Sequence, residues 1–234
     1  MDFTYNEICV ILQSQQENEH RKERAMKNLL CFGDSNTFGY NPENKSRYDF
    51  SDRWTGILSR KLQPFGVRVD EEGLCGRTTD FEDRFRVGRK GSDTLPLLLE
   101  SHTPQLVIIM LGTNDCKSCY GNTSEAIARG ADKLIGQVRA YSSDIKILLI
   151  SPIHLADGVG EQGYDEEFDE SSVLLSRELK TAYRALAHKT GCEFLAAADY
   201  AAPSEMDREH LDKAGHRALA EAIFDKLLRV ESIV

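Results

Sequence analysis

The sequence lacks the features that mark membrane proteins and nucleic-acid-binding proteins. No stretch approaches the ~20 consecutive apolar residues that a membrane span requires. The 234-residue chain has 38 acidic and 29 basic residues, for a net charge of -9, and shows no basic stripe suited to nucleic acid or an anionic lipid surface. We therefore expect neither nucleic acid nor a membrane among its partners.

Cysteine is too sparse for the disulfide framework of a small secreted domain, since only six are scattered along the chain. Cys116 and Cys119 have the spacing of a redox pair or half a zinc site, but no second pair with that spacing follows. We interpret these cysteines as structural, and we expect no metal, no cofactor and a cytoplasmic location.

The N-terminal segment lacks the marks of a signal peptide. Its short apolar run at residues 8–12 has no basic region before it and no small-residue cleavage site after it. Residues 13–27 are polar and charged. We expect residues 1–25 to form a tail outside the fold and residues 26–234 to form a single domain. A start at Met26 would agree with this hypothesis, and the alternative is an extra helix docked on the surface.

What the sequence does contain is a five-fold alternation of strand and helix patterns, in a chain that is 41% hydrophobic and has ample core to bury. Short apolar runs predict strands at residues 29–32, 67–73, 106–111, 145–150 and 193–197. Apolar residues at helical spacing predict helices at 52–62, 95–99, from 124, 174–186 and 213–229. A polar, acidic, glycine-rich loop is predicted at 156–170.

This alternation predicts an α/β fold. Strands joined by helices of this length imply right-handed crossovers and a parallel sheet that is covered on both faces. We expect a three-layer α/β/α sandwich with a five-stranded parallel sheet in the flavodoxin-like order 2-1-3-4-5, although the sequence alone does not fix the order.

Chemically suited residues follow four of the five predicted strands. Ser35 follows the first strand, Gly76 the second and Asn114 the third, while Asp207 and His210 follow the fifth. The carboxyl ends of parallel strands meet at the same edge of a sheet, where binding sites form. We therefore expect these separate segments to meet in one site.

These residue types are suited to acyl transfer. A serine hydroxyl needs a base to take its proton, and histidine is the usual base near neutral pH, oriented by a carboxylate. Asp207 and His210 are three residues apart, a spacing that lets a turn fold the carboxylate onto the ring. The N–H groups of Ser35 and Gly76 and the Asn114 carboxamide would form an oxyanion hole, where each donor is worth ~3–4 kcal/mol.

Each motif also has an ordinary structural reading. Gly-Asp-Ser is a common turn, and the segment around Asn114 is suited to helix capping. His216 competes with His210 for the base role, but it falls inside the last predicted helix. Phe38, Tyr40 and Trp54 would form apolar walls for the acyl group, or equally could be core residues.

The chain resembles the SGNH (GDSL-type) hydrolases, and more closely their arylesterase and acyltransferase branch. Ser35 matches the family nucleophile, Gly76 and Asn114 the oxyanion hole, and His210 and Asp207 the base and its partner. The resemblance spans nearly all of residues 27–229 and is carried by these strings: Leu30-Cys31-Phe32-Gly33-Asp34-Ser35, Arg53-Trp54-Thr55-Gly56, Glu71-Glu72-Gly73-Leu74, Arg77-Thr78-Thr79 and 106–115.

The resemblance implies the three-layer fold, a metal-free mechanism, small acyl esters as substrates and a homo-oligomer. Two residues depart from the family pattern. Asn36 replaces the leucine of the usual tetrapeptide, which alters the wall beside the nucleophile. Phe38 stands where acyltransferase members tend to carry tryptophan, which argues against strong transfer to alcohols in water.

The sequence therefore predicts a serine esterase that acts on a small-molecule ester through an acyl-enzyme, with some acyltransferase activity as an option. One alternative keeps the fold and removes acetyl groups from carbohydrates. A second is a non-catalytic binding module that uses the same crevice. A metal-dependent phosphoesterase is more distant, because no second cluster of ligands completes a two-metal site.

Overall fold

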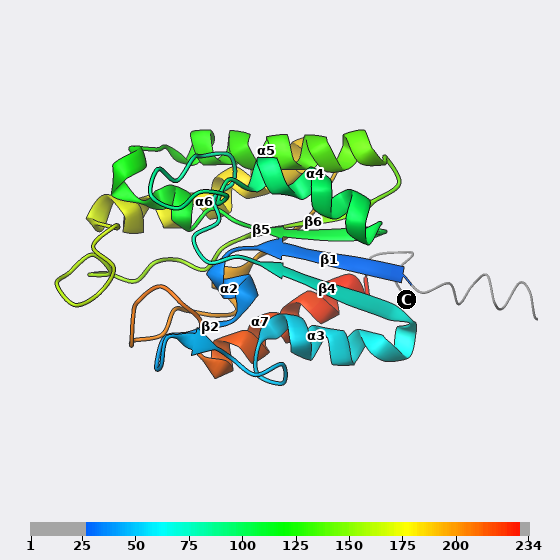
Figure 1. Cartoon of the computed structure of the whole chain (residues 1–234), viewed down its shortest axis with the longest axis horizontal. Coiled ribbons are helices and arrows are strands. Elements are labelled where there is room, and N and C mark those ends of the chain that lie inside the picture. The colour runs from blue at the N-terminus through cyan, green and yellow to red at the C-terminus, as the bar shows by residue number, and fades with distance from the viewer. Residues whose placement is uncertain (1–26, 230–234) are drawn as a thin grey trace, which may run out of the picture.

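The computed structural model describes residues 27–229, which contain one five-stranded sheet between two layers of helices (Figure 1). The tail predicted for residues 1–25 lies outside the described residues. The five strands are β1 (Lys27–Gly33), β4 (Val67–Gly73), β5 (Leu106–Met110), β6 (Lys146–Ser151) and β7 (Glu193–Ala196).

The strands pair in the order β4-β1-β5-β6-β7, and every pairing is parallel. This is the flavodoxin-like 2-1-3-4-5 order, so the predicted fold class and strand order are confirmed. β1 lies between β4 and β5, with Gly33 paired to Gly73 on one side and to Met110 on the other. The ends of these three strands are therefore level, and the loops that follow them start side by side.

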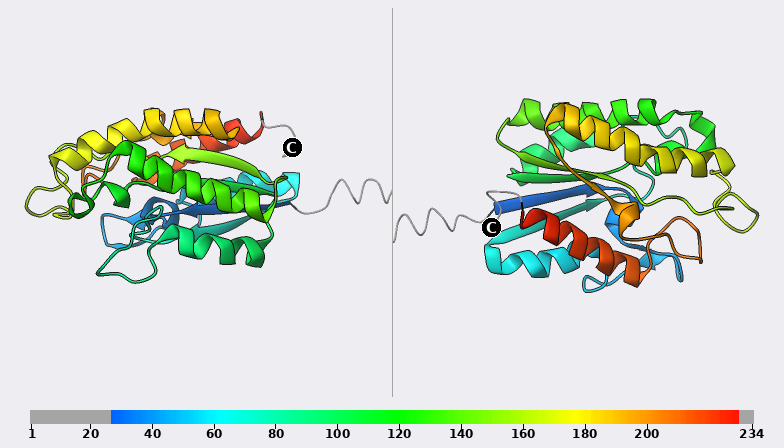
Figure 2. Two further views of the ribbon diagram at one scale, coloured as in Figure 1. Left: turned by 90° about the horizontal axis from the view of Figure 1, so that it is seen from above. Right: turned by 180° about the vertical axis from the view of Figure 1, so that it is seen from behind.

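Five longer helices cover the sheet, with α4, α5 and α6 on one face and α3 and α7 on the other (Figures 1 and 2). α6 begins with a capping box at Asp169 and ends at Gly191, whose φ of 66° is the left-handed conformation expected at a helix stop. The helices are α3 (Trp54–Leu62), α4 (Gly91–His102), α5 (Ser124–Tyr141), α6 (Glu170–Thr190) and α7 (Lys213–Leu227).

The hydrophobic core lies on both faces of the sheet, and β5 shows why its sequence is a continuous apolar run. All five residues of β5 are buried. Val107 and Ile109 pack with the α4, α5 and α6 layer, whereas Leu106, Ile108 and Met110 pack with the α3 and α7 layer. A central strand buried on both faces needs an apolar residue at every position.

α4 begins earlier than the sequence predicts, at Gly91 rather than near Leu95. Its first turn contains small polar residues without an apolar stripe, and Pro96 lies inside the helix. Proline has no N–H, so it leaves the carbonyl of Ser92, four residues earlier, without a helical partner. The Gln137 amide of α5 donates to that carbonyl at 2.7 Å, and a tertiary contact thus satisfies a group that the helix cannot.

Several short elements are absent from the sequence prediction because they are too brief to show periodicity. They include the helix α2 (Ser35–Phe38) and a two-stranded antiparallel ribbon of β2 (Tyr40–Asn41) and β3 (Ser46–Arg47). Four 3-10 turns join the described elements, at Gln63–Phe65, Asn114–Cys116, Ser118–Tyr120 and Ala197–Asp199. α2 and the ribbon follow β1 directly and so lie at the carboxyl edge of the sheet.

No helix within residues 27–229 has the length and apolar character needed to span a membrane. Over the same residues, no group of three or more histidine, cysteine, aspartate and glutamate side chains is arranged to hold a metal ion. The cysteines of the described segment are free thiols, Cys116 and Cys119 among them.

Candidate active site

The site lies at the carboxyl edge of the sheet, where the loops after β1, β4 and β5 meet. Ser35 is the first residue of α2 and follows β1 at once. Gly76 lies three residues after the end of β4, and Asn114 begins a 3-10 turn after β5. The segment with Asp207 and His210 joins β7 to α7 and returns from the far side of the sheet to reach Ser35.

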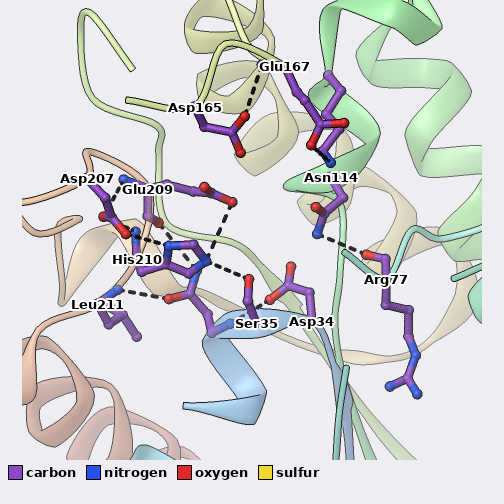
Figure 3. Close-up of polar contacts among 12 residues, drawn as sticks. Asp34, Ser35, Arg77, Asn114, Asp165, Glu167, Asp207, Glu209, His210 and Leu211 are labelled. Atoms are coloured by element: carbon purple, nitrogen blue, oxygen red, sulfur yellow. Dashed lines mark hydrogen bonds and ion pairs between the residues drawn. The ribbon is translucent and has the colours of Figure 1, made fainter. Parts of the chain in front are cut away.

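Ser35, His210 and Asp207 form a continuous chain of hydrogen bonds (Figure 3). Nε2 of His210 is 2.8 Å from Oγ of Ser35, and Nδ1 of His210 is 2.6 Å from Oδ2 of Asp207. In the neutral ring, Nδ1–H donates to the carboxylate and Nε2 accepts from the serine hydroxyl. The structure thus brings together three residues that are up to 175 positions apart in sequence.

Backbone bonds fix Asp207 in this orientation. Its Oδ1 accepts the N–H groups of Glu209 and His210 at 3.1 and 2.9 Å, while Oδ2 faces the imidazole. Burial raises the pKa of Asp207, but the bond from His210 and the two backbone donors outweigh burial and hold the pKa below its usual value. The carboxylate therefore stays ionised against the ring.

The turn that carries Asp207 and His210 has an unusual backbone at Arg208, whose φ is 62°. Left-handed φ is uncommon for a side chain of this size and persists where the surroundings hold it. The Arg208 carbonyl accepts the N–H of Ala156, and its guanidinium donates to the carbonyl of Gly158 and to Glu161. The loop after β6 therefore holds this turn in place.

Asn36, the residue after Ser35, binds the backbone on both sides of His210. Its Oδ1 accepts the N–H of Leu211 at 2.9 Å, and its Nδ2 donates to the carbonyl of Glu209 at 3.4 Å. The carbonyl of Asn36 in turn accepts the indole N–H of Trp54 at 3.0 Å. The side chain that departs from the usual tetrapeptide therefore ties the serine segment to the histidine segment, where leucine would form neither bond.

Asn114 lies beside Arg77, on the side of Ser35 away from Glu209 (Figure 3). The Nδ2 group of Asn114 donates to the carbonyl of Arg77, the residue after Gly76, at 3.2 Å. Gly76 has a φ of 83°, which favours glycine, and a Cβ there would lie 3.0 Å from the Arg86 guanidinium. This geometry is compatible with the Gly76 N–H and the Asn114 carboxamide both facing one substrate oxygen.

Buried polar contacts hold the loops after β4 and β5 in fixed positions relative to each other. Asp115 accepts the N–H of Thr79 at 2.9 Å and also its hydroxyl, which joins the loop after β5 to the loop after β4. The Arg77 guanidinium donates to the carbonyl of Gly33 at 2.8 Å and to that of Glu72. These contacts fix the ends of β1, β4 and β5 relative to one another.

Several acidic groups lie buried in the site and change one another's protonation. Burial raises the pKa of Asp34 to about 6, of Asp115 to about 7 and of Glu209 to about 7. Burial lowers the pKa of His210, but the charge of Glu209 and the bond to Asp207 outweigh it and raise that pKa to about 9. Imidazolium is therefore favoured at neutral pH, and the free base form grows as the pH rises.

The three aromatic residues predicted as substrate walls lie in different surroundings. Tyr40 is half-buried, and its ring lies 4.4 Å from the His210 ring, centroid to centroid. Phe38 is half-buried beneath the Arg47 guanidinium. Trp54 is fully buried, and its indole N–H donates to the carbonyl of Asn36. Of the three rings, that of Tyr40 is the one in contact with His210.

His216, the competing base, lies inside α7, and its ring contacts Tyr48 and the backbone of Trp54. It is fully buried, and its Nδ1 accepts the N–H of Trp54 at 3.3 Å. Burial lowers its pKa to about 4, so the ring is neutral. These contacts agree with the structural role predicted for it.

Sequence reasoning missed two polar residues of this site, Asn36 as a bridge and Glu209 as a buried acid. Asn36 was visible as a departure from the family tetrapeptide, but its partners lie 173 and 175 residues away. Glu209 directly precedes the histidine, yet nothing in the sequence shows that its carboxylate is buried. Its position beside Nε2 of His210 appears only in the folded chain.

Comparisons with known proteins agree with this geometry. Residues 31–218 match the model of the GDSL-like lipase/acylhydrolase family. The chain is 31% identical to an arylesterase of Vibrio mimicus over 130 residues, which cover 54% of this chain and 56% of that protein. The chain thus spans little more than half the length of that curated relative.

Solved structures match over a larger part of the fold. An aryl esterase of M. smegmatis is 33% identical with a TM-score of 0.80, and the match covers 86% of this chain and 98% of that one. A carbohydrate acetylesterase from Sinorhizobium meliloti is 37% identical with a TM-score of 0.78, over the same shares of the two chains. The predicted resemblance to SGNH hydrolases is thereby confirmed, and the chain belongs to the GDSL-like lipase/acylhydrolase family of ester hydrolases.

Proposed function

We propose that the protein is a serine esterase that hydrolyses small acyl esters through an acyl-enzyme, with Ser35 as nucleophile, His210 as base and Asp207 as its partner. The observation that carries the proposal is the 2.8 Å contact between Oγ of Ser35 and Nε2 of His210, continued at 2.6 Å to Asp207. A buried serine that is hydrogen-bonded to an oriented imidazole is the arrangement that activates a hydroxyl for attack on a carbonyl carbon.

In the acylation step, Nε2 of His210 takes the proton of Ser35 as Oγ forms a bond to the acyl carbon. The carbonyl π electrons move to oxygen and create a tetrahedral oxyanion. When the intermediate collapses, the bond between carbon and the leaving oxygen breaks, and His210 returns the proton to that oxygen. The alcohol leaves and Ser35 carries the acyl group.

The oxyanion would be stabilised by the N–H groups of Ser35 and Gly76 and by the Asn114 carboxamide. The bond from Asn114 to the Arg77 carbonyl keeps its amide group beside Gly76. Donors that are held before the reaction starts lose little free energy in reorganising, and each is worth ~3–4 kcal/mol in related hydrolases.

In the deacylation step, a water molecule takes the place of the leaving alcohol. His210 removes its proton as the hydroxide oxygen attacks the acyl carbon, and it then protonates Oγ of Ser35 as the acid departs. An alcohol that reached the same position would give transesterification. We expect transfer to be the minor outcome, since Phe38 replaces the tryptophan of the acyltransferase members.

The substrates are proposed to be small aryl or alkyl esters. The relatives described as aryl esterases support this class, and the half-buried Tyr40 beside His210 offers one apolar surface for the substrate. Removal of acetyl groups from carbohydrates is the second candidate, favoured by the 37% identity to a carbohydrate acetylesterase. A homo-oligomeric state and a cytoplasmic location stay predictions.

The deciding experiment is a p-nitrophenyl ester assay from acetate to laurate, run on wild type and on Ser35→Ala. We expect activity confined to short acyl chains and abolished by the substitution, while the melting temperature changes little. Full turnover by Ser35→Ala would reject the assigned nucleophile. An inactive wild type on every ester would instead favour the binding-module alternative.

A matched pair of histidine variants tests the base. His210→Ala should lose nearly all activity and remain folded. His216→Ala should stay active and lose stability, because it removes a fully buried ring that bonds to α3. An active His210→Ala together with an inactive His216→Ala would assign the base to His216 instead.

A further inference from the structure

The Glu209 carboxylate lies beside the reacting atoms, and the reaction described above gives it no task. Its Oε1 is 3.6 Å from Nε2 of His210, the ring nitrogen that faces Ser35. The side chain is 7% exposed, so the carboxylate is buried but still reachable from the site. In Figure 3 it lies on the opposite side of Ser35 from Asn114.

The contacts of this carboxylate within residues 27–229 do not include a hydrogen bond. Its partner is the His210 ring, whose Nε2 lies 3.6 Å away as an ion pair while it bonds to Ser35. Burial raises the pKa of Glu209 to about 7; the charge of His210 opposes this rise, and the charges of Asp165, Asp207 and Asp34 add to it. A buried acid without a hydrogen-bond donor destabilises a fold and therefore calls for an explanation.

The position of Glu209 identifies which part of an ester it would contact. The acyl oxygen lies toward Asn114, whereas the leaving oxygen must lie within a hydrogen-bond length, roughly 3 Å, of Nε2 to receive its proton. Glu209 is near that same nitrogen and thus borders the alcohol part of the ester. Its carboxylate accepts hydrogen bonds and donates none when ionised.

We propose that Glu209 selects the alcohol part of the substrate by accepting a hydrogen bond from a hydroxyl on the carbon next to the ester-bearing carbon. In such an alcohol the free hydroxyl and the leaving oxygen are separated by about one hydrogen-bond length, which matches the spacing between Glu209 and the region around Nε2. The favoured substrates are then monoesters of vicinal diols, the arrangement that recurs along sugars and polyols. This inference rests on the proposed esterase function.

The same carboxylate disfavours other alcohols. A leaving group that carries a carboxylate would face Glu209, Asp165 and Asp207, all of one sign, and would be repelled. A plain alkyl group of the same size would leave Glu209 without a donor. A hydrogen bond to an ionised group is among the stronger ones in proteins, so we expect at least about tenfold discrimination.

The test compares two acetates of equal size, 2-hydroxyethyl acetate and propyl acetate, by the ratio of their kcat/KM values at pH 8. We expect wild type to favour the hydroxyethyl ester at least tenfold. Glu209→Leu should reduce the ratio to about one, and Glu209→Gln, which keeps an acceptor oxygen without the charge, should give an intermediate ratio. Because the ratio is internal to each variant, a general loss of activity does not affect it.

Asp157→Asn is the matched control, since it also removes one negative charge from the loop after β6. The Asp157 carboxylate bonds to Arg177 at 2.7 Å and is largely exposed, so the ratio should remain that of wild type. Melting curves check that each variant is folded. If Glu209→Leu does not fold, the ratios of wild type and Glu209→Gln decide the question.

Three results would overturn the inference. One is equal rates of wild type on the two acetates, and another is an unchanged ratio in Glu209→Gln or Glu209→Leu. The third is a preference for acetylcholine over its neutral isostere 3,3-dimethylbutyl acetate that exceeds the hydroxyl preference, because charge alone would then explain selection. Phenyl acetate separates the two proposals: its hydrolysis without a hydroxyl preference rejects only the role of Glu209, while no hydrolysis of any ester rejects the esterase itself.

Discussion

Strand β5 and the segment that follows it are buried to the same extent and differ completely in chemistry. Leu106–Met110 are all apolar, and each is 5% exposed or less. Thr113, Asn114 and Asp115 come three residues later, are all polar, and are 3% exposed or less. Burial of the strand stabilises the fold, whereas burial of the polar segment lowers stability unless each group finds a partner.

The comparison shows that stability and chemistry are separated along one short stretch of chain, residues 106–115. Strand β5 joins the two hydrophobic layers. The polar segment after it joins neighbouring loops, through Asp115 to Thr79 and through Asn114 to Arg77. Substitutions in the buried core and in the site should therefore affect different measurements.

The largest effect is expected at the carboxylate that orients the base. Asp207→Asn keeps the size of the side chain but lets an amide face Nδ1 of His210, which favours the wrong tautomer. We expect kcat to fall by roughly 10⁴-fold, as in related hydrogen-bonded serine sites, with a small change in melting temperature. Asp199→Asn, at an exposed ion pair with Lys180, is the control and should keep full activity. An Asp207→Asn variant with the kcat of wild type would show that this carboxylate does not orient the base.

The next effect is on stability alone. Ile108→Ala in the middle of β5 removes a fully buried side chain and should lower the free energy of unfolding by about 2–5 kcal/mol. The folded fraction should retain the kcat of wild type, since Ile108 lies within the strand. Urea denaturation gives the first quantity and an active-site titration the second. Leu97→Ala, at an exposed position on α4, should change neither.

A smaller effect is expected from the bridge between Ser35 and His210. Asn36→Leu restores the usual family residue and removes both bonds to the histidine segment. We expect kcat to fall by roughly 10- to 100-fold, with a smaller change in KM, because the base is held less well against the nucleophile. Asn28→Leu removes a side-chain bond to the backbone at the amino end of β1, away from the site, and should affect stability only. Equal kcat values for both variants would show that Asn36 has no positioning role.

The smallest effect is a shift in pH dependence. The negative charge of Glu209 helps to raise the pKa of His210 to about 9, so kcat/KM for phenyl acetate should rise with pH up to that range. Glu209→Gln removes the charge, which makes the imidazolium less favourable and lowers the pKa of the base. The rising limb should move to lower pH by about one unit, equivalent to 1.4 kcal/mol. A rising limb that stayed at the same pH or moved to higher pH in Glu209→Gln, while Asp157→Asn matched wild type, would show that Glu209 is not coupled to the base.

Sequence patterns were sufficient for the elements whose periodicity is long. The five strands and the helices α3, α5, α6 and α7 lie within a few residues of the predicted ranges, because their apolar stripes come from the core. The pattern failed at α4, where the first turn is polar and Pro96 is satisfied by Gln137 from another helix. It also missed the ribbon of β2 and β3, since two-residue strands show no alternation.

The same distinction holds inside the site. The contact between Asp207 and His210 follows from local spacing, because a turn of four residues can close it. The contacts of the Asn36 side chain with the backbone of Leu211 and of Glu209 join remote segments, and no local pattern encodes them. The role of the acidic loop in holding Arg208 was likewise visible only as a long polar insertion.

By itself the sequence determined the alternation of elements, the two-sided burial of the central strand and the residue types gathered at one edge of the sheet. These features depend on hydrophobic periodicity and on the rule that the carboxyl ends of parallel strands meet. Tertiary structure alone decided how close the serine and imidazole lie, which residue holds them there, and that the Glu209 carboxylate is buried beside the base. Those properties depend on distances between remote segments and on exclusion of water, which exist only once the chain has packed.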